Sequence, residues 1–349
     1  MSEQQSQTIT SAQNDPEQLP PTERRFSAKS LLSGSVGRNL GLVLALLALF
    51  AVGAITAGER FTNVDNILVI LRLASIIGVI SIGMTFVIIG GGIDLSVGSV
   101  MGLASVVATL SAVQVAAENS TWLVMVFVAL AVGLAAGFIN GIVIAYGKVV
   151  AFMATLAMLV AARGLAEILA NRQTQVVRIP EYIEFMNLDL LGVDMLIWIF
   201  ILVAVGGWIL LNRTTFGRRT IAIGGNREAA RLAGLAVRRH TIYLYALAGL
   251  TAGIAAVMIL GRTTAGTSTH GMLYELDAIA AVVVGGTLLA GGRGTITGTV
   301  FGVLIFATLT NVFTQNNLST SVQAVAKGVI IVIAVLLQQR FSGQGSRTQ

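Results

Sequence analysis

The residues of this sequence that could do chemistry are few, and they lie among glycines. Residues 90–99 read Gly-Gly-Gly-Ile-Asp-Leu-Ser-Val-Gly-Ser, so that one carboxylate and two hydroxyls stand between two apolar runs. Two interpretations of Asp94 stay open. Its carboxylate can N-cap the helix that follows and complement the dipole of that helix. Alternatively, it lines a gate or a pathway, because ionisable groups inside apolar spans usually face a cavity.

A second Gly-rich segment repeats the first. Residues 291–302 match residues 91–102, and the glycines at positions 91, 92, 98 and 102 recur at 291, 292, 298 and 302. Transporters are often built from two related halves, with Gly-interrupted segments at equivalent positions near the substrate path. The pattern therefore predicts an internal repeat.

Three more charges lie within apolar runs. Arg163 and Glu167 are four residues apart, so we expect them to neutralise each other within one helix. Lys327 has no obvious local partner and must find one, face water or snorkel. The candidate residues for a translocation path or gate are Gly91, Gly92, Asp94, Ser96, Gly98, Ser99, Gly291, Gly292 and Lys327.

A third motif lies in a polar, Arg-rich stretch. Residues 224–234 read Gly-Gly-Asn-Arg-Glu-Ala-Ala-Arg-Leu-Ala-Gly. Asn226 is a good N-cap, Gly234 suits the position just past a helix end, and the residues between them favour about two helical turns. Such a helix is either a rigid handle that seats in a soluble partner or an interfacial helix held on anionic lipid. The candidate coupling residues are Asn226, Arg227, Glu228, Ala229, Ala230, Arg231 and Gly234.

Missing residues and motifs narrow the function. The chain has no cysteine and two histidines, which excludes thiolate chemistry and a His-rich metal site. It contains no G-x-x-x-x-G-K-[ST], H-E-x-x-H or G-x-S-x-G sequence. We therefore expect a chain that is not an enzyme, holds no metal or cofactor, and leaves any use of ATP to a partner subunit.

Composition predicts the elements that must position these motifs. Of the 349 residues, 55% are hydrophobic and 11% are charged, with a mean hydropathy of +0.84, whereas soluble domains have about 25% charged residues. With roughly 20 apolar residues needed per span, the sequence predicts an all-α polytopic membrane protein with about ten transmembrane helices. The ten predicted spans are residues 39–57, 67–89, 96–116, 121–145, 149–170, 193–211, 241–260, 276–290, 296–314 and 322–338.

The basic residues predict the orientation of these spans. With a cytoplasmic N-terminus, fifteen of the 22 Lys and Arg residues fall in cytoplasmic segments and four fall outside, as the positive-inside rule requires. We therefore expect both termini to be cytoplasmic. The same placement accounts for the net charge of +6 without a nucleic-acid partner.

The predicted domain plan follows from the spans. Residues 1–38 form a disordered cytoplasmic tail, residues 39–338 the transmembrane domain, and residues 339–349 a cytoplasmic C-terminal tail. Within the domain, residues 212–240 form the only long cytoplasmic loop and carry seven arginines. The longest external loop, residues 171–192, carries three acidic residues and is a candidate docking surface for an extracytoplasmic partner.

Five motifs, in order along residues 40–338, resemble the ribose-type (monosaccharide) permeases of ABC importers. They are residues 82–99, residues 152–156 with Arg163-Gly164, and residues 224–234, 274–287 and 290–294. The resemblance implies a permease subunit in the bacterial cytoplasmic (inner) membrane that forms the translocation path for a monosaccharide, closest to ribose. It also implies a second permease copy in a homodimer, an ABC ATPase subunit and an extracytoplasmic sugar-binding protein.

The same resemblance gives the third motif a role. Glu228-Ala229-Ala230 with Gly234 fits the EAA-x-x-x-G pattern of importer permeases, so that residues 227–233 would be the coupling helix. The sequence departs from that pattern because no Ile-x-Leu-Pro follows. Two rival functions stay open: a branched-chain amino-acid permease of the same superfamily, and an ion-coupled secondary transporter that needs no ATPase.

Overall fold

The computed structural model describes residues 35–343. Most of the two predicted tails lies outside the described residues. At their inner edges, however, helix α2 already begins at Ser35 and helix α16 continues to Gly343, so residues 35–38 and 339–343 are helical.

The described residues are almost entirely helical, and their few strands are two residues long. The helices are α2 (Ser35–Ala57), α3 (Glu59–Thr62), α4 (Val64–Ile89), α5 (Val97–Ala108), α6 (Ser111–Glu118), α7 (Leu123–Ala145), α8 (Ala151–Ala170), α9 (Pro180–Met186), α10 (Met195–Arg213), α11 (Thr215–Gly225), α12 (Arg227–Leu232), α13 (Val237–Thr263), α14 (Tyr274–Val284), α15 (Ile296–Gln315) and α16 (Thr320–Gly343). Strand β1 (Gln175–Val176) pairs antiparallel with β4 (Ala265–Gly266), and β2 (Asp189–Leu190) pairs with β3 (Val193–Asp194).

A helix lies at each of the ten predicted positions, but fewer of them qualify as full spans. By length and composition, seven helices among the described residues can cross a membrane: α2, α4, α7, α8, α10, α13 and α15. The pair α5 and α6 would add an eighth, with a bend of 56° between the two helices. Helix α14 has 11 residues, about half of the roughly 20 that a bilayer core needs. The eighth predicted span is therefore a half-helix flanked by non-helical chain.

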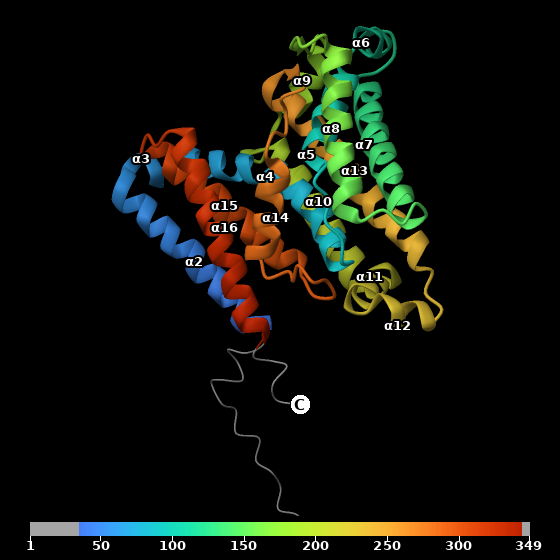
Figure 1. Cartoon of the computed structure of the whole chain (residues 1–349). Coiled ribbons are helices and arrows are strands. Elements are labelled where there is room, and N and C mark those ends of the chain that lie inside the picture. The colour runs from blue at the N-terminus through green and yellow to red at the C-terminus, as the bar shows by residue number, and fades with distance from the viewer. Residues whose placement is uncertain (1–34, 344–349) are drawn as a thin grey trace, which may run out of the picture. The chain divides into compact units, whose positions relative to one another are not determined.

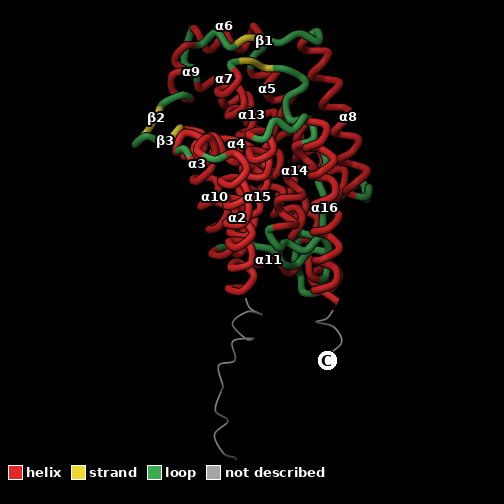
Figure 2. Tube along the Cα trace, turned by 90° about the vertical axis from the view of Figure 1, so that its left-hand side faces the viewer, coloured by secondary structure: helices red, strands yellow, loops and turns green. Residues whose placement is uncertain are grey.

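The helices define two ends, which Figures 1 and 2 both show. Helices α6 and α9 lie at one end, hereafter the α6 end, and α11 lies with α12 at the other, hereafter the α12 end. Helices α5 and α15, which follow the two copies of the repeat, both begin toward the α12 end. The two copies therefore run in the same direction, as the ten-span plan implies.

Glycines let the central helices approach to backbone contact. Helices α7 and α13 pack along Gly133 and Gly137 on one side and Gly249 and Gly253 on the other. A Cβ added to Gly133 would overlap the carbonyl oxygen of Gly249. Four-residue spacing of small residues is a typical packing device where lipid supplies no hydrophobic drive between helices. The pair α7 and α13 is therefore held together by its backbones.

A second cluster joins α4 to α15. Asn66 of α4 and Asn311 of α15 exchange amide hydrogen bonds of 3.1 and 2.8 Å, and both side chains are buried. Gln315 donates a further bond of 2.9 Å to Asn66. Around them pack Phe61, Phe306 and other apolar side chains. Satisfied amide networks fix the register of neighbouring helices in an apolar environment, and this one holds the second copy of the repeat against α4.

Candidate functional site

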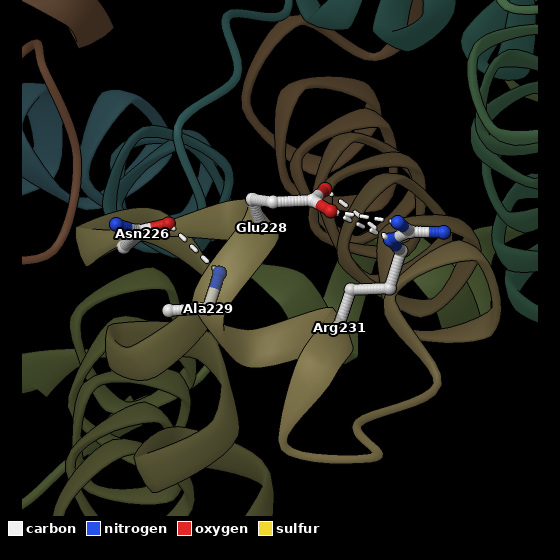
Figure 3. Close-up of polar contacts among 4 residues, drawn as sticks. All are labelled: Asn226, Glu228, Ala229 and Arg231. Atoms are coloured by element: carbon white, nitrogen blue, oxygen red, sulfur yellow. Dashed lines mark hydrogen bonds and ion pairs between the residues drawn. The ribbon is translucent and has the colours of Figure 1, made fainter.

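The third sequence motif forms the short helix that its caps predict. The Asn226 side chain accepts a hydrogen bond of 2.9 Å from the backbone N–H of Ala229, and Gly234 ends the segment with φ of 81°. Arg231 donates to Glu228 at 2.6 Å across one turn (Figure 3). The hydrogen bonds from Arg231 and its positive charge lower the pKa of the exposed Glu228 carboxyl. Helix α12 is thus a capped, charged turn, one residue shorter than predicted.

One face of α12 is attached to the protein and the other is free. Ala230 is buried against Ile223 of α11 and Val237 of α13. On the opposite side Glu228, Arg231 and Leu232 are exposed, Leu232 at 77%. A rigidly anchored helix with a charged and apolar free face is suited to seat in a partner.

The two Gly-rich turns of the repeat meet each other at the α12 end. Gly91, Gly291 and Gly292 have φ of 79°, 88° and 74°, in the left-handed region that favours glycine. The backbone N–H of Gly292 donates a hydrogen bond of 2.8 Å to the carbonyl oxygen of Ile89, at the end of α4. A Cβ on Gly291 would lie 3.0 Å from the Cα of Gly91. The two copies of the repeat therefore touch through their backbones.

Gly224 and Gly225, which directly precede α12, pack against the same backbone contact. A Cβ on Gly224 would overlap the carbonyl oxygen of Ile89 and would lie 2.7 Å from the N of Gly292. A Cβ on Gly292 would lie 2.7 Å from the Cα of Gly225. We call this meeting of Ile89, Gly91, Gly224–Gly225 and Gly291–Gly292 the glycine junction. Asn226, the N-cap of α12, is the next residue along the chain.

Asp94 holds a turn rather than a helix N-cap. Its Oδ1 accepts hydrogen bonds from the backbone N–H of Ser96 at 2.8 Å and from the Ser96 hydroxyl at 2.6 Å. Asn140 of α7 donates to the same hydroxyl at 2.9 Å. Asp94 and Ser96 are each 1% exposed. Ser96 is the residue that precedes α5 and makes no side-chain cap of its own, so the carboxylate organises the chain that leads into the helix.

The remaining candidates of the first Gly-rich segment are packing positions. Gly92 makes room for the ring of Tyr245, whose hydroxyl donates 3.2 Å to the carbonyl oxygen of Ile93. Gly98 is in backbone contact with Gly271, and the carboxylate of Glu275 lies over it. The buried Ser99 hydroxyl donates to the carbonyl oxygen of Ser96 at 2.9 Å. Whether any of these residues contacts a solute stays a prediction.

The charges in apolar runs find partners that local spacing does not give. Lys327 forms an ion pair of 3.0 Å with Asp277 of α14, and both side chains are mostly buried. Glu167 pairs with Arg172 at 3.3 Å. Arg163 instead donates hydrogen bonds to the carbonyl oxygens of Ser268 and His270, the latter at 2.9 Å. Arg163 and Glu167 therefore form no direct ion pair, because the non-helical chain before α14 offers Arg163 two carbonyls and Glu167 pairs with Arg172.

Sequence reasoning missed the residues that complete these contacts. Asn140 and Tyr245 lie far along the chain from the first Gly-rich segment, Ile89 lies far from Gly292, and no local pattern marks these contacts. Gly224 lies in the third motif, but no functional role is predicted for it from the sequence. Its signal is the Gly-Gly pair directly before an N-cap. Within residues 35–343, no group of three or more His, Cys, Asp or Glu could hold a metal ion.

The apolar helices, the half-helix and the Gly-broken repeat together define a polytopic membrane permease. A family model described as "Branched-chain amino acid transport system / permease component" matches residues 66–335, and the chain belongs to that family. No solved structure matches the chain.

Individual relatives give a finer picture. The chain is 39% identical over 308 residues to the ribose import permease protein RbsC of Escherichia coli K12. The aligned region covers 85% of this chain and 92% of the relative. It is 39% identical over 328 residues to RbsC of Bacillus subtilis, covering 93% and 99%. The L-arabinose transport system permease protein AraH of E. coli K12 is 35% identical over 323 residues, covering 90% and 94%. The resemblance to ribose-type permeases is thereby confirmed.

The turn at Asp94 yields a test of its role. Asp94→Asn keeps an oxygen that can accept both bonds from Ser96, whereas Asp94→Ala leaves a buried N–H and a hydroxyl with fewer partners, at about 1–3 kcal/mol for each unsatisfied group. We expect the Asn variant to keep the thermal stability and uptake of the wild type, and the Ala variant to unfold at lower temperature in detergent. An Asn variant that folds normally but no longer transports would instead show that the negative charge itself acts in the path.

Proposed function

We propose that this chain is the membrane-spanning permease subunit of an ATP-driven importer for a monosaccharide, and that ribose is its solute. The observation that carries the proposal is the 39% identity, over most of both chains, to permeases whose names specify ribose import. Relatives named for L-arabinose are less similar, at 35% identity. The order of these identities favours ribose over arabinose.

Energy input through a separate subunit is supported by the chain itself. It carries no phosphate-binding G-x-x-x-x-G-K-[ST] loop, yet it presents α12 as an anchored helix with a free, charged face. An ABC ATPase subunit is the partner that this face fits. The permease would catalyse no bond chemistry and would alternate between two states of its path.

Sidedness follows from the same element. If α12 contacts the ATPase, the α12 end is cytoplasmic, and the arginine-rich chain around it satisfies the positive-inside rule. The α6 end, with the chain from β1 to β3, then faces outward and presents the exposed acidic residues Glu181, Glu184 and Asp189. We propose this surface for an extracytoplasmic sugar-binding protein. A second permease copy and a bacterial inner-membrane location complete the proposal.

Uptake of labelled solutes by cells tests the proposed substrate. We expect cells that carry the chain with its ATPase and binding protein to accumulate labelled ribose and to lose that accumulation when the chain is deleted. Accumulation of labelled leucine instead would establish the branched-chain amino-acid alternative. Uptake by the purified chain alone, driven by an ion gradient, would establish a secondary transporter and remove the ATPase from the account.

The charge pair on α12 provides a test of coupling. Arg231→Glu places two acidic groups on adjacent turns of a free face, and we expect it to abolish uptake while the protein still inserts. The exchange variant Glu228→Arg with Arg231→Glu restores an ion pair within the helix, but the acidic and the basic group have changed places on the face that contacts the partner. We therefore expect it to lose uptake as well. Uptake at the wild-type rate in both variants, compared at equal membrane levels, would show that α12 lies on lipid instead.

A further inference from the structure

The chain between α13 and α15 crosses the protein as a discontinuous segment. After α13 ends at Thr263, only β4 and the 11-residue α14 are regular before α15 begins at Ile296. Non-helical backbone at membrane depth is tolerated only where protein buries it or water reaches it. Its contacts therefore show what this segment is joined to. We call residues 265–292 the discontinuous segment.

At the α6 end the discontinuous segment is paired with the outward chain. Strand β4 pairs with β1 in the register Gln175 with Gly266 and Val176 with Ala265. The backbone N–H of Val177 donates 2.9 Å to the carbonyl oxygen of Thr264. The chain from β1 to β3 is the surface proposed above for the binding protein, so any shift of β1 acts directly on the start of the segment.

In its first part, residues 266–271, the segment lies on one face of α5. Gly266 lies against Ser105 and Thr109, the carbonyls of Ser268 and His270 lie over Gly102, and Gly271 lies against Gly98. These α5 positions recur every three or four residues, which places them on one side of the helix. Arg163 of α8, which also lies beside Gly102, binds the carbonyls of Ser268 and His270. The first part of the segment is therefore held by small residues of α5 and by one guanidinium. Its second part, α14, packs on α15, where a Cβ on Gly298 or Gly302 would overlap the carbonyl oxygen of Gly285 or Ala281.

At the α12 end the segment terminates in the glycine junction. Gly292 donates 2.8 Å to Ile89 and lies in backbone contact with Gly225, the residue directly before the N-cap of α12. Backbone contacts transmit a displacement without the slack of flexible side chains. Helix α13 also runs between the two ends and packs by backbone on α7, so it is the rival connection that the experiment must separate from the segment.

We propose that the discontinuous segment is the link that carries the docking of the solute-binding protein to α12, with Gly291 and Gly292 as positioning residues. The inference rests on the proposed function. In this account a shift of β1 moves β4, the chain up to Gly271 passes the shift along α5, α14 passes it along α15, and the glycine junction moves the start of α12. Stimulation of the ATPase by the loaded binding protein therefore depends on the length of this one segment, because a longer segment would absorb the shift.

An insertion in the last turn of the segment can loosen the link. Two residues, Gly-Ser, inserted between Leu289 and Ala290 lengthen the partly exposed turn before the glycine junction. The insertion opens the turn that the backbone hydrogen bonds of Leu288 with Gly291 and Arg293 close, and lengthening a loop by two residues adds little closure entropy. The matched control carries the same insertion between Lys148 and Val149, in the exposed connection of α7 and α8. Both variants are purified with the ATPase subunit, reconstituted in nanodiscs, and assayed for ATP hydrolysis with and without ribose-loaded binding protein.

The expected result distinguishes the discontinuous segment from α13 as the connection between the two ends. The basal hydrolysis rate stays at the wild-type level in both variants, whereas the ratio of stimulated to basal rate falls to about one in the 289/290 insertion only, which is the loss of coupling between the two sites. A 289/290 variant stimulated as strongly as the wild type would overturn the proposal and leave α13 as the connection. A wild-type complex that ribose-loaded binding protein does not stimulate would instead contradict the proposed function.

A reversible crosslink tests the outer half independently of the insertion. The chain has no cysteine, so Val176→Cys with Ala265→Cys introduces a unique pair at facing positions of an antiparallel ladder, within disulfide reach. If β1 and β4 move as one unit, the oxidised pair is stimulated as fully as the reduced pair. Loss of stimulation on oxidation, restored by reductant, would show that β1 and β4 must separate and would contradict the link.

Discussion

The contact on which the rest of the structure depends is the meeting of three backbones at Ile89. A carbonyl at the end of α4 accepts a hydrogen bond from Gly292 and is so close to Gly224 that no side chain fits between them. Each partner belongs to a different part of the chain: the first copy of the repeat, the second copy, and the approach to α12. Because all three meet without side chains, none can shift far unless the others shift or the contact opens.

The apolar surroundings explain why the contact is made of glycine and backbone. Between lipid-facing helices there is little hydrophobic drive for association, so close packing and hydrogen bonds must supply it. Broken segments leave peptide groups that need partners inside the protein. The glycine junction, the Asp94 turn and the Arg163 contacts with Ser268 and His270 all satisfy such groups. Binding partners at either end then act on a network of fixed backbone contacts.

Sequence patterns within one segment predict local features, such as the position of a helix and its caps. The apolar runs located the helices, and Asn226 with Gly234 located α12 to within a residue, because capping is local. The eighth segment, residues 276–290, is short and Gly-rich, which leaves open whether it spans fully, since apolar composition does not reveal where the hydrogen bonding of a helix stops; the structure makes it the half-helix α14. Gly91 and Gly291 were identified as equivalent, but not as neighbours, because a contact across 200 positions (291 minus 91) leaves no local signal. For the same reason, no local pattern predicts that Arg163 binds the His270 carbonyl or that Lys327 pairs with Asp277.

Two adjacent glycines allow the most direct measurement of the central claim, which is that the glycine junction ties α12 to both copies of the repeat. A Cβ at Gly224 would overlap the Ile89 carbonyl, whereas a Cβ at Gly225 meets nothing within 4 Å. The measurement is uptake of labelled ribose by cells carrying Gly224→Ala or Gly225→Ala, normalised to the amount of each protein in the membrane. The account predicts that Gly224→Ala loses uptake and Gly225→Ala keeps it. Equal, wild-type uptake by both variants would contradict the account.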